Sequence, residues 1–258
     1  MACRVPSGEV IMKKIAFIPA RSGSKRVVDK NIRTLGRHPL LAYAVSAAVK
    51  SGCFDSVVCA TDSEAYAEIA VKYGAEVPVL RPAQISSETS PDIEWVTFML
   101  KEVQSKDQFY DIFAILRPTS PFRAASTIKR AMDEFLANEK ADSIRAVQMV
   151  SEHPGKMWVC RDNSLLPLFP MSEAGVPWHS CQYQSLPPVL VQNASLEIAR
   201  TERVFATGSI SGSVVAPFFT LGFEGFDINT EEDWRLAEIY LESEMELSNM
   251  CEEISTID

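Results

Sequence analysis

Short apolar runs alternate with helical patterns through the first 150 residues of the sequence. The apolar runs have strand length and lie at 15–19, 56–61, 111–116 and 142–149. Apolar residues recur with helical spacing between them, over 39–50, 62–73, 91–104 and 124–136. Strands that are joined by helices form parallel sheets covered on both faces. The alternation therefore predicts an α/β fold, with a largely parallel sheet in a three-layer, Rossmann-like domain.

The pattern changes after about residue 150. Residues 151–199 are rich in prolines and aromatic side chains and show little helical period, whereas strand and helix patterns return from residue 200 onward. We therefore expect 13–150 and 200–248 to form one α/β domain, with 151–199 as a small insertion. Further strands are predicted at 76–80, 214–219 and 223–228, a helix after Thr230, and a frayed segment over the last ten residues.

Composition excludes several classes of protein. The 258 residues carry a formal net charge of -9, which argues against nucleic acid as a partner. No apolar run approaches the roughly 18 residues of a membrane-spanning helix. Six cysteines are scattered without a C-x-x-C pair, as in a reduced, cytoplasmic protein. Residues 1–11 lack the apolar core of a signal peptide, and we interpret them as an extension or as the result of an alternative start before Met12.

Positive charge is concentrated directly after the first predicted strand. One stretch of ten residues in this acidic chain carries four cations: Arg21, Lys25, Arg26 and Lys30. Gly23, in the same stretch, lets the backbone approach a ligand closely. Charge-assisted hydrogen bonds to phosphate are stronger than neutral ones, so a polyphosphate explains the cluster. The Walker and G-x-G-x-x-G patterns are absent here. The residues alone also leave open a solvated basic turn.

The order Pro-Ala-Arg-Ser-Gly-Ser-Lys, followed by Lys-Asn at 30–31, resembles the signature loop of the acylneuraminate (sialic acid) cytidylyltransferases. These enzymes join CMP to a nine-carbon keto-acid sugar and release pyrophosphate. The resemblance covers about residues 13–242 and is carried by further segments at 80–89, 115–123, 152–156, 184–193 and 226–230. It implies a nucleotidyltransferase of the glycosyltransferase-A type, with CTP and a keto-acid sugar as substrates. It also implies Mg²⁺ as cofactor and a homodimer formed through the insertion, which would lend residues to the partner's sugar site.

The resemblance assigns roles to individual residues. The catalytic roles fall on Arg21, Lys25, Lys30 and Asp227. The nucleotide would be bound by Arg21, Ser24, Lys25, Lys30, Asn31, Arg81, Arg117, Thr119 and Ser120. The sugar would be bound by Lys156, Tyr183, Gln184, Asn193 and Glu197. The metal would be held by Asp227 and Asn229.

Four of these positions depart from the family pattern. Asn229 stands where a second metal carboxylate is expected, and Arg117 replaces a glutamine near the acceptor hydroxyl or the base. Tyr183 stands in place of an arginine that holds the sugar acid, and Glu197 in place of a tyrosine. Three of the changes lie on the sugar side, so the sequence predicts cytidylyl transfer and leaves the sugar open among nonulosonic acids of the N-acetylneuraminic, legionaminic and pseudaminic types. The alternatives are an eight-carbon keto-acid (Kdo) as substrate, or a nucleotide-binding homologue without turnover.

Overall fold

The computed structural model describes residues 12–104, 109–171 and 175–257, so the extension over 1–11 lies outside the described residues. The chain forms two compact units: the first comprises residues up to 146 together with those from 193 onward, and the second spans Val147–Gln192. The predicted insertion had been placed at 151–199, and its role in dimerisation stays a prediction. No helix in the described ranges is long and apolar enough to cross a membrane.

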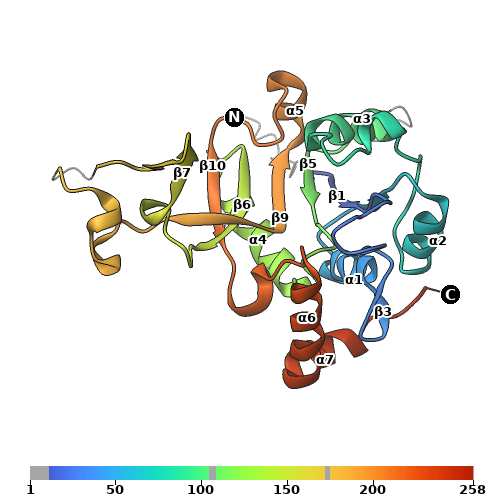
Figure 1. Cartoon of the computed structure of the whole chain (residues 1–258). Coiled ribbons are helices and arrows are strands. Elements are labelled where there is room, and N and C mark those ends of the chain that lie inside the picture. The colour runs from blue at the N-terminus through green and yellow to red at the C-terminus, as the bar shows by residue number, and fades with distance from the viewer. Residues whose placement is uncertain (1–11, 105–108, 172–174, 258) are drawn as a thin grey trace, which may run out of the picture. The chain divides into compact units, whose positions relative to one another are not determined.

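A six-stranded sheet with the order β10-β6-β9-β5-β1-β4 forms the centre of the first unit (Figure 1). Its strands are β1 (Lys14–Pro19), β4 (Ser56–Ala60), β5 (Ile112–Ile115), β6 (Ser143–Met149), β9 (Leu190–Arg200) and β10 (Val215–Phe219). Strand β1 pairs in parallel with both β4 and β5, and β9 runs antiparallel to β5. The predicted α/β fold with a parallel centre is confirmed. Strand β9 was not predicted at its full length of 11 residues, which is why the expected insertion extended to 199.

Helices cover both faces of this sheet. They are α1 (Leu40–Ser51), α2 (Glu64–Lys72), α3 (Asp92–Gln104), α4 (Ala125–Ala137), α5 (Thr201–Thr207), α6 (Glu231–Ser243) and α7 (Met245–Glu252). Alternate residues of β1 point to opposite faces, as strand geometry requires. Ala16 and Ile18 pack with α1 and α4, whereas Ile15 and Phe17 pack with α3 and α5. The sheet is therefore the middle of three layers, as predicted.

Two short hairpins complete the strands. In the first unit, β2 (Thr34–Leu35) pairs with β3 (His38–Pro39) just before α1. In the second unit, β7 (Trp158–Arg161) pairs with β8 (Ser164–Pro167). The turn between β7 and β8 consists of Asp162 and Asn163, which both have positive φ, as the tight turns of hairpins require. Most side chains of the β7–β8 hairpin are exposed.

Two of the predicted strands are wrong. Over 76–80 only an isolated bridge from Glu76 to β4 forms, because Pro78 has no N–H to continue a ladder. Over 223–228 the chain instead begins with a 3₁₀ turn at Gly222–Gly225. The apolar residues that suggested a strand pack their rings into an aromatic cluster instead. The cluster consists of Phe122, Phe223, Phe226 and Tyr240.

The prediction of a frayed C-terminal segment is also wrong. Leu247, Cys251 and Ile254 follow one another at helical spacing and are all buried. They join a core cluster that also contains Trp234 of α6 and Val27, which lies within the cationic loop. The last helix therefore supports a loop more than two hundred residues earlier in the sequence.

Candidate functional site

The loop after β1 is held in shape by contacts within the protein. Gly23 has φ +70°, a conformation that side chains disfavour. The carboxylate of Asp62, two residues after β4, accepts hydrogen bonds from the Ser22 backbone N–H at 2.7 Å and from the Ser22 hydroxyl at 3.0 Å. The Asn31 amide donates to the carbonyl oxygen of Arg21 at 3.0 Å and ties the two ends of the loop together. These bonds leave most of the cationic side chains directed toward a cavity.

A cavity of about 610 Å³ opens at the carboxyl ends of β1 and β5. Eight of the predicted nucleotide-binding residues line it: Arg21, Ser24, Lys25, Lys30, Asn31, Arg81, Arg117 and Thr119. The ninth, Ser120, is 1% exposed and is buried next to them in sequence. The other lining residues are Pro19, Arg26, Ser87, Glu88, Ser90, Asp92, Trp95 and Pro118. Six basic and two acidic side chains among the lining residues suit the cavity to a polyanion.

The lysines of the loop differ in their surroundings. Lys25 is 79% exposed at its side chain and forms a 3.2 Å ion pair with Glu88. Lys30 is more enclosed, and its ammonium donates a 2.7 Å hydrogen bond to the carbonyl oxygen of Ile228. Burial lowers the pKa of Lys30, and the nearby charge of Asp227 partly opposes that shift. Lys30 therefore connects the cavity with the segment before α6.

Arg81 lies deeper in the cavity wall and is only 6% exposed. Its guanidinium lies over the ring of Trp95, 5.3 Å from the ring centroid, and donates to the carbonyl oxygen of Ile85. Burial lowers the pKa of Arg81, although the charges of Asp62 and Asp92 oppose this. The packing fixes the plane of this guanidinium, so that it can recognise only groups of matching geometry.

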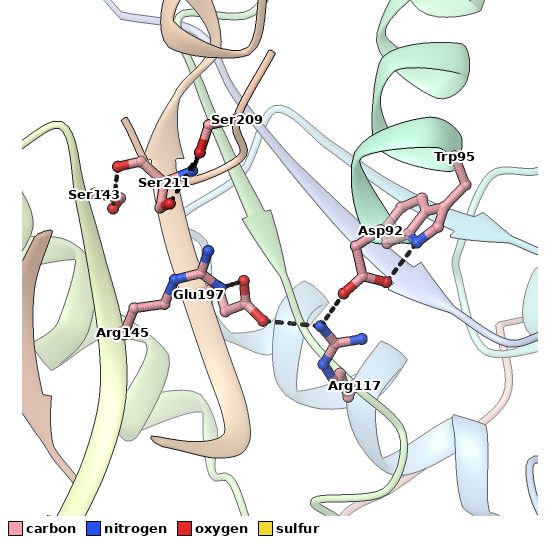
Figure 2. A network of polar contacts seen from close by, with 8 residues as sticks. All are labelled: Asp92, Trp95, Arg117, Ser143, Arg145, Glu197, Ser209 and Ser211. Atoms are coloured by element: carbon pink, nitrogen blue, oxygen red, sulfur yellow. Dashed lines mark hydrogen bonds and ion pairs between the residues drawn. The ribbon is translucent and has the colours of Figure 1, made fainter. Parts of the chain in front are cut away.

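A chain of charged contacts forms another part of the wall (Figure 2). The indole N–H of Trp95 donates to Asp92 at 2.7 Å, and Asp92 pairs with Arg117 at 2.6 Å. Arg117 also pairs with Glu197 of β9 at 2.8 Å, and Glu197 pairs in turn with Arg145 of β6. Two predicted residues thus meet here: Arg117, assigned to the nucleotide, and Glu197, assigned to the sugar.

The predicted metal ligands lie beside Lys30. The Asn229 amide nitrogen donates to Oδ2 of Asp227 at 2.6 Å, while Oδ1 of Asp227 is buried without a hydrogen-bond partner. A buried carboxylate oxygen without a partner is costly, and a cation would satisfy it. The Asn229 amide presents its nitrogen rather than its oxygen to Asp227; a rotation of 180° would exchange the two atoms. The described residues contain no group of three or more His, Cys, Asp or Glu side chains that could hold a metal.

The remaining predicted sugar residues fall in both units. Lys156 and Tyr183 belong to the second unit, where the Lys156 ammonium donates to the carbonyl oxygens of His179 and Cys181 at 2.8 and 2.5 Å. Gln184 is exposed on a short turn of the same unit. Asn193 belongs to the first unit, and its amide donates to the hydroxyl of Thr220 at 2.9 Å. Within the first unit, Glu197 contacts Arg117.

Comparison with known proteins bears on this cavity. A sequence profile of the cytidylyltransferase family matches residues 15–162, which include the loop, Arg81 and Arg117. The chain belongs to the cytidylyltransferase family. The CMP-N,N'-diacetyllegionaminic acid synthase of Legionella pneumophila is 35% identical over 242 residues, which cover 91% of this chain and 99% of that protein. The N-acylneuraminate cytidylyltransferase of Escherichia coli is 41% identical over 135 residues, covering 52% of this chain and 31% of that longer protein.

A solved structure of a CMP-2-keto-3-deoxy-manno-octonic acid synthetase in complex with CTP has the same fold. It superposes with a TM-score of 0.63 over 90% of this cytidylyltransferase and 100% of that chain. The sequences are only 13% identical, so this likeness establishes the fold alone.

Several cavity residues were missed from the sequence. Glu88, Asp92 and Trp95 line the cavity, but they are not part of the cation cluster and were assigned no role. The spacing of Asp92 and Trp95 was a usable signal, because residues three apart at the start of a helix lie on the same face. Asp62 follows a predicted strand at the edge where the sequence also places the loop, and it holds the loop through Ser22.

Proposed function

We propose that this cytidylyltransferase transfers CMP from CTP to a nonulosonic, sialic-acid-like keto-acid sugar and releases pyrophosphate. The single observation that carries the proposal is the cavity, where the cationic loop lies at the carboxyl ends of parallel strands. The names of the relatives, which describe CMP-legionaminic acid synthesis and N-acylneuraminate cytidylyl transfer, support this substrate class.

In this reaction the anomeric hydroxyl of the sugar attacks the α-phosphorus of CTP, and the bond to the β,γ-pyrophosphate breaks. Arg21, Lys25 and Lys30 line the cavity and would bind the triphosphate. Because their charges are in place before the reaction, they stabilise the negative charge that moves onto the leaving pyrophosphate. The bond from Lys30 to Ile228 fixes the direction of one of these charges. The protein's main contributions are orientation and electrostatic stabilisation.

We further propose Mg²⁺ as cofactor, with Asp227 as its main protein ligand. The buried Oδ1 of Asp227 without a partner supports this, and Asn229 would serve through its oxygen after the amide rotates. When bound, Mg²⁺ would neutralise phosphate charge and polarise the phosphoryl oxygens. One carboxylate and one amide make a weak site, so phosphate oxygens and water would supply the remaining ligands.

We also propose a cytoplasmic homodimer that associates through the second unit. Many large apolar side chains of this unit are exposed, and contiguous exposed apolar surface marks an interaction site. They include Met157, Trp158, Val159, Leu165, Leu166, Leu168, Phe169 and Met171. A second copy of the same surface would cover them, because symmetric dimers pair identical patches. The free cysteines Cys53, Cys59, Cys160, Cys181 and Cys251 support a reducing, cytoplasmic location.

The test is pyrophosphate release from CTP with a panel of sugars. The panel contains N-acetylneuraminic, legionaminic and pseudaminic acids and the eight-carbon Kdo. We expect release with at least one nine-carbon acid, a loss of rate for Arg21→Ala, and an unchanged rate for Val28→Ala, a loop residue 68% exposed that does not line the cavity. Release with Kdo alone, or with none of the sugars, would overturn the proposal.

A further inference from the structure

Arg123 is a buried arginine without an acidic partner among the described residues. It lies two residues before α4 and is only 1% exposed. Its Nε and Nη2 atoms are buried and have no hydrogen-bond partner in the described part of the chain. Burial lowers the pKa of Arg123 to about 9, which leaves the side chain charged at neutral pH. A buried charge that no carboxylate neutralises destabilises a fold, so stability does not explain this residue.

The remaining nitrogen of Arg123 joins two chain segments beyond the end of their ladder. Nη1 donates to the carbonyl oxygen of Arg117 at 3.2 Å and also to that of Ser195. The ladder between β5 and β9 ends two residues before Arg117, and its register, if continued, would set Arg117 opposite Ser195. The guanidinium therefore bridges the two segments at the point where their backbone pairing has stopped.

The turn that is held in this way is part of the cavity wall. Arg117, Pro118 and Thr119 line the cavity. The Ser120 N–H donates to the carbonyl oxygen of Arg117 at 3.3 Å. This oxygen thus accepts both the bond that closes the turn and a bond from the guanidinium. The position of the turn relative to β9 therefore depends on Arg123.

The same turn is connected with the proposed metal site. The carbonyl oxygen of Thr119 accepts a 2.8 Å hydrogen bond from the backbone N–H of Ile228, which lies between Asp227 and Asn229. A shift of the turn would therefore move both the cavity wall and the segment that carries the proposed Mg²⁺ ligands. Misplacement of reacting groups by about 1 Å reduces a rate by about a hundredfold.

We propose that Arg123 is a positioning residue for the transfer reaction. Its guanidinium sets the turn 117–120 against β9, and the turn in its place orients the nucleotide toward the metal segment. Arg123 is not a catalytic residue, because it is buried and does not line the cavity. Its charge destabilises the fold, and the geometry of the site is what requires it. The inference rests on the proposed function, which supplies the nucleotide and the reaction.

Arg123→Met separates positioning from support of the fold. Methionine is flexible and apolar, so the variant loses the buried charge and both bonds to carbonyl oxygens but still fills much of the space. We expect the affinity for CTP and the kcat for pyrophosphate release each to fall at least about tenfold. The affinity for inorganic triphosphate should stay within twofold of the wild type, because the cationic loop is held by its own contacts. The melting temperature should not fall, since no unpaired charge is buried any longer.

Two further variants complete the test, with calorimetry for both ligands. Arg200→Met is the matched control, because the Arg200 guanidinium also donates to a backbone carbonyl oxygen, that of Ala141, and does not line the cavity. It should leave both affinities and kcat within twofold of the wild type. Arg123→Lys keeps the charge on a shorter side chain that cannot reach both oxygens, so it should not restore the affinity for CTP.

Several results would overturn the proposal. They are an Arg123→Met protein that binds CTP within twofold of the wild type, an equal loss of affinity for CTP and triphosphate, full restoration by lysine, or failure of both Arg123 variants to fold. A merely structural role would lower the melting temperature and weaken both ligands together. The binding measurements need no turnover. If no sugar releases pyrophosphate while the affinities separate as expected, the proposed function fails and the positioning role of Arg123 stands.

Discussion

Replacing Lys30 by methionine tests the anion-binding role of the loop most directly. Methionine has nearly the same length and packs well, so Lys30→Met removes mainly the ammonium and its 2.7 Å hydrogen bond to Ile228. A charge-assisted hydrogen bond contributes about 1.5–3 kcal/mol. We therefore expect the Kd for CTP to rise about ten- to a hundredfold.

The pKa of Lys30 gives two further expectations. Burial lowers this pKa, which means that the charged ammonium is less stable in the folded protein without ligand than in water. Lys30→Met should therefore not lower the melting temperature. The lysine must be protonated to bind an anion. CTP affinity of the wild type should therefore fall as pH rises through the lowered pKa, at a lower pH than for an ordinary lysine. The variant should lack this step. In the absence of ligand, the unfolded chain binds more protons at Lys30 than the folded protein does over this pH range. The contribution of Lys30 to the free energy of unfolding therefore rises with pH over the same range.

Calorimetric titration with CTP at several pH values measures these effects. Lys50→Met is the matched control, because its ammonium pairs with the exposed Glu253 and the residue does not line the cavity. Loss of an exposed pair away from the cavity should leave the affinity for CTP within about twofold of the wild type. A Lys30→Met protein that binds CTP like the wild type, or a greater loss for Lys50→Met, would refute the reasoning.

Four other outcomes are expected. Asp227→Ala should nearly abolish pyrophosphate release in a folded protein. Asn229→Asp should lower the Mg²⁺ concentration for half-maximal rate, because two carboxylates hold a hard cation better than one. Unchanged Mg²⁺ dependence in both variants would place the metal elsewhere. Leu165→Asp, on an exposed strand of the second unit, should convert the proposed dimer to a monomer in light scattering, while Ser164→Asp beside it should not. Thr230→Ala removes the hydroxyl that caps α6 and should lower the free energy of unfolding by about 1 kcal/mol in denaturant titrations; no change would mean that the cap is redundant.

The sheet was predictable because its central strands are apolar runs that need no tertiary information. β1, β4 and β5 are buried on both faces, and such strands stand out in sequence. Local patterns failed where apolar residues pack without forming a strand, as around Phe223 and Phe226, whose rings join an aromatic cluster. They failed also where packing orders a segment that is polar on average, as in α7.

The part of the site that could be predicted from the sequence consists of residues that local charge or the family resemblance indicates. The loop cations lie within ten residues of one another, so the sequence alone shows them together. The pairing of Arg117 with Glu197 joins residues 80 positions apart, and that of Arg117 with Asp92 joins residues 25 apart. No periodicity in the sequence carries such contacts. The register of β5 with β9 places Glu197 opposite Ile115 and so near Arg117, whereas Asp92 comes from the start of α3. The compensated charge of Arg117 is therefore visible only in the folded protein.

The core cluster that contains Val27 has a consequence for how the protein is made. Val27 lies between two cavity residues, Arg26 and Lys30, yet it packs in a cluster that Leu247 and Ile254 help to complete. During synthesis that cluster stays open until the last helix has left the ribosome, because contacts distant in sequence form only after both partners exist. The cationic loop thus emerges long before α7 and gains its full support only when α7 follows. Ribosome-bound chains that stop before Leu247 should therefore bind CTP poorly, although every cavity residue is already present.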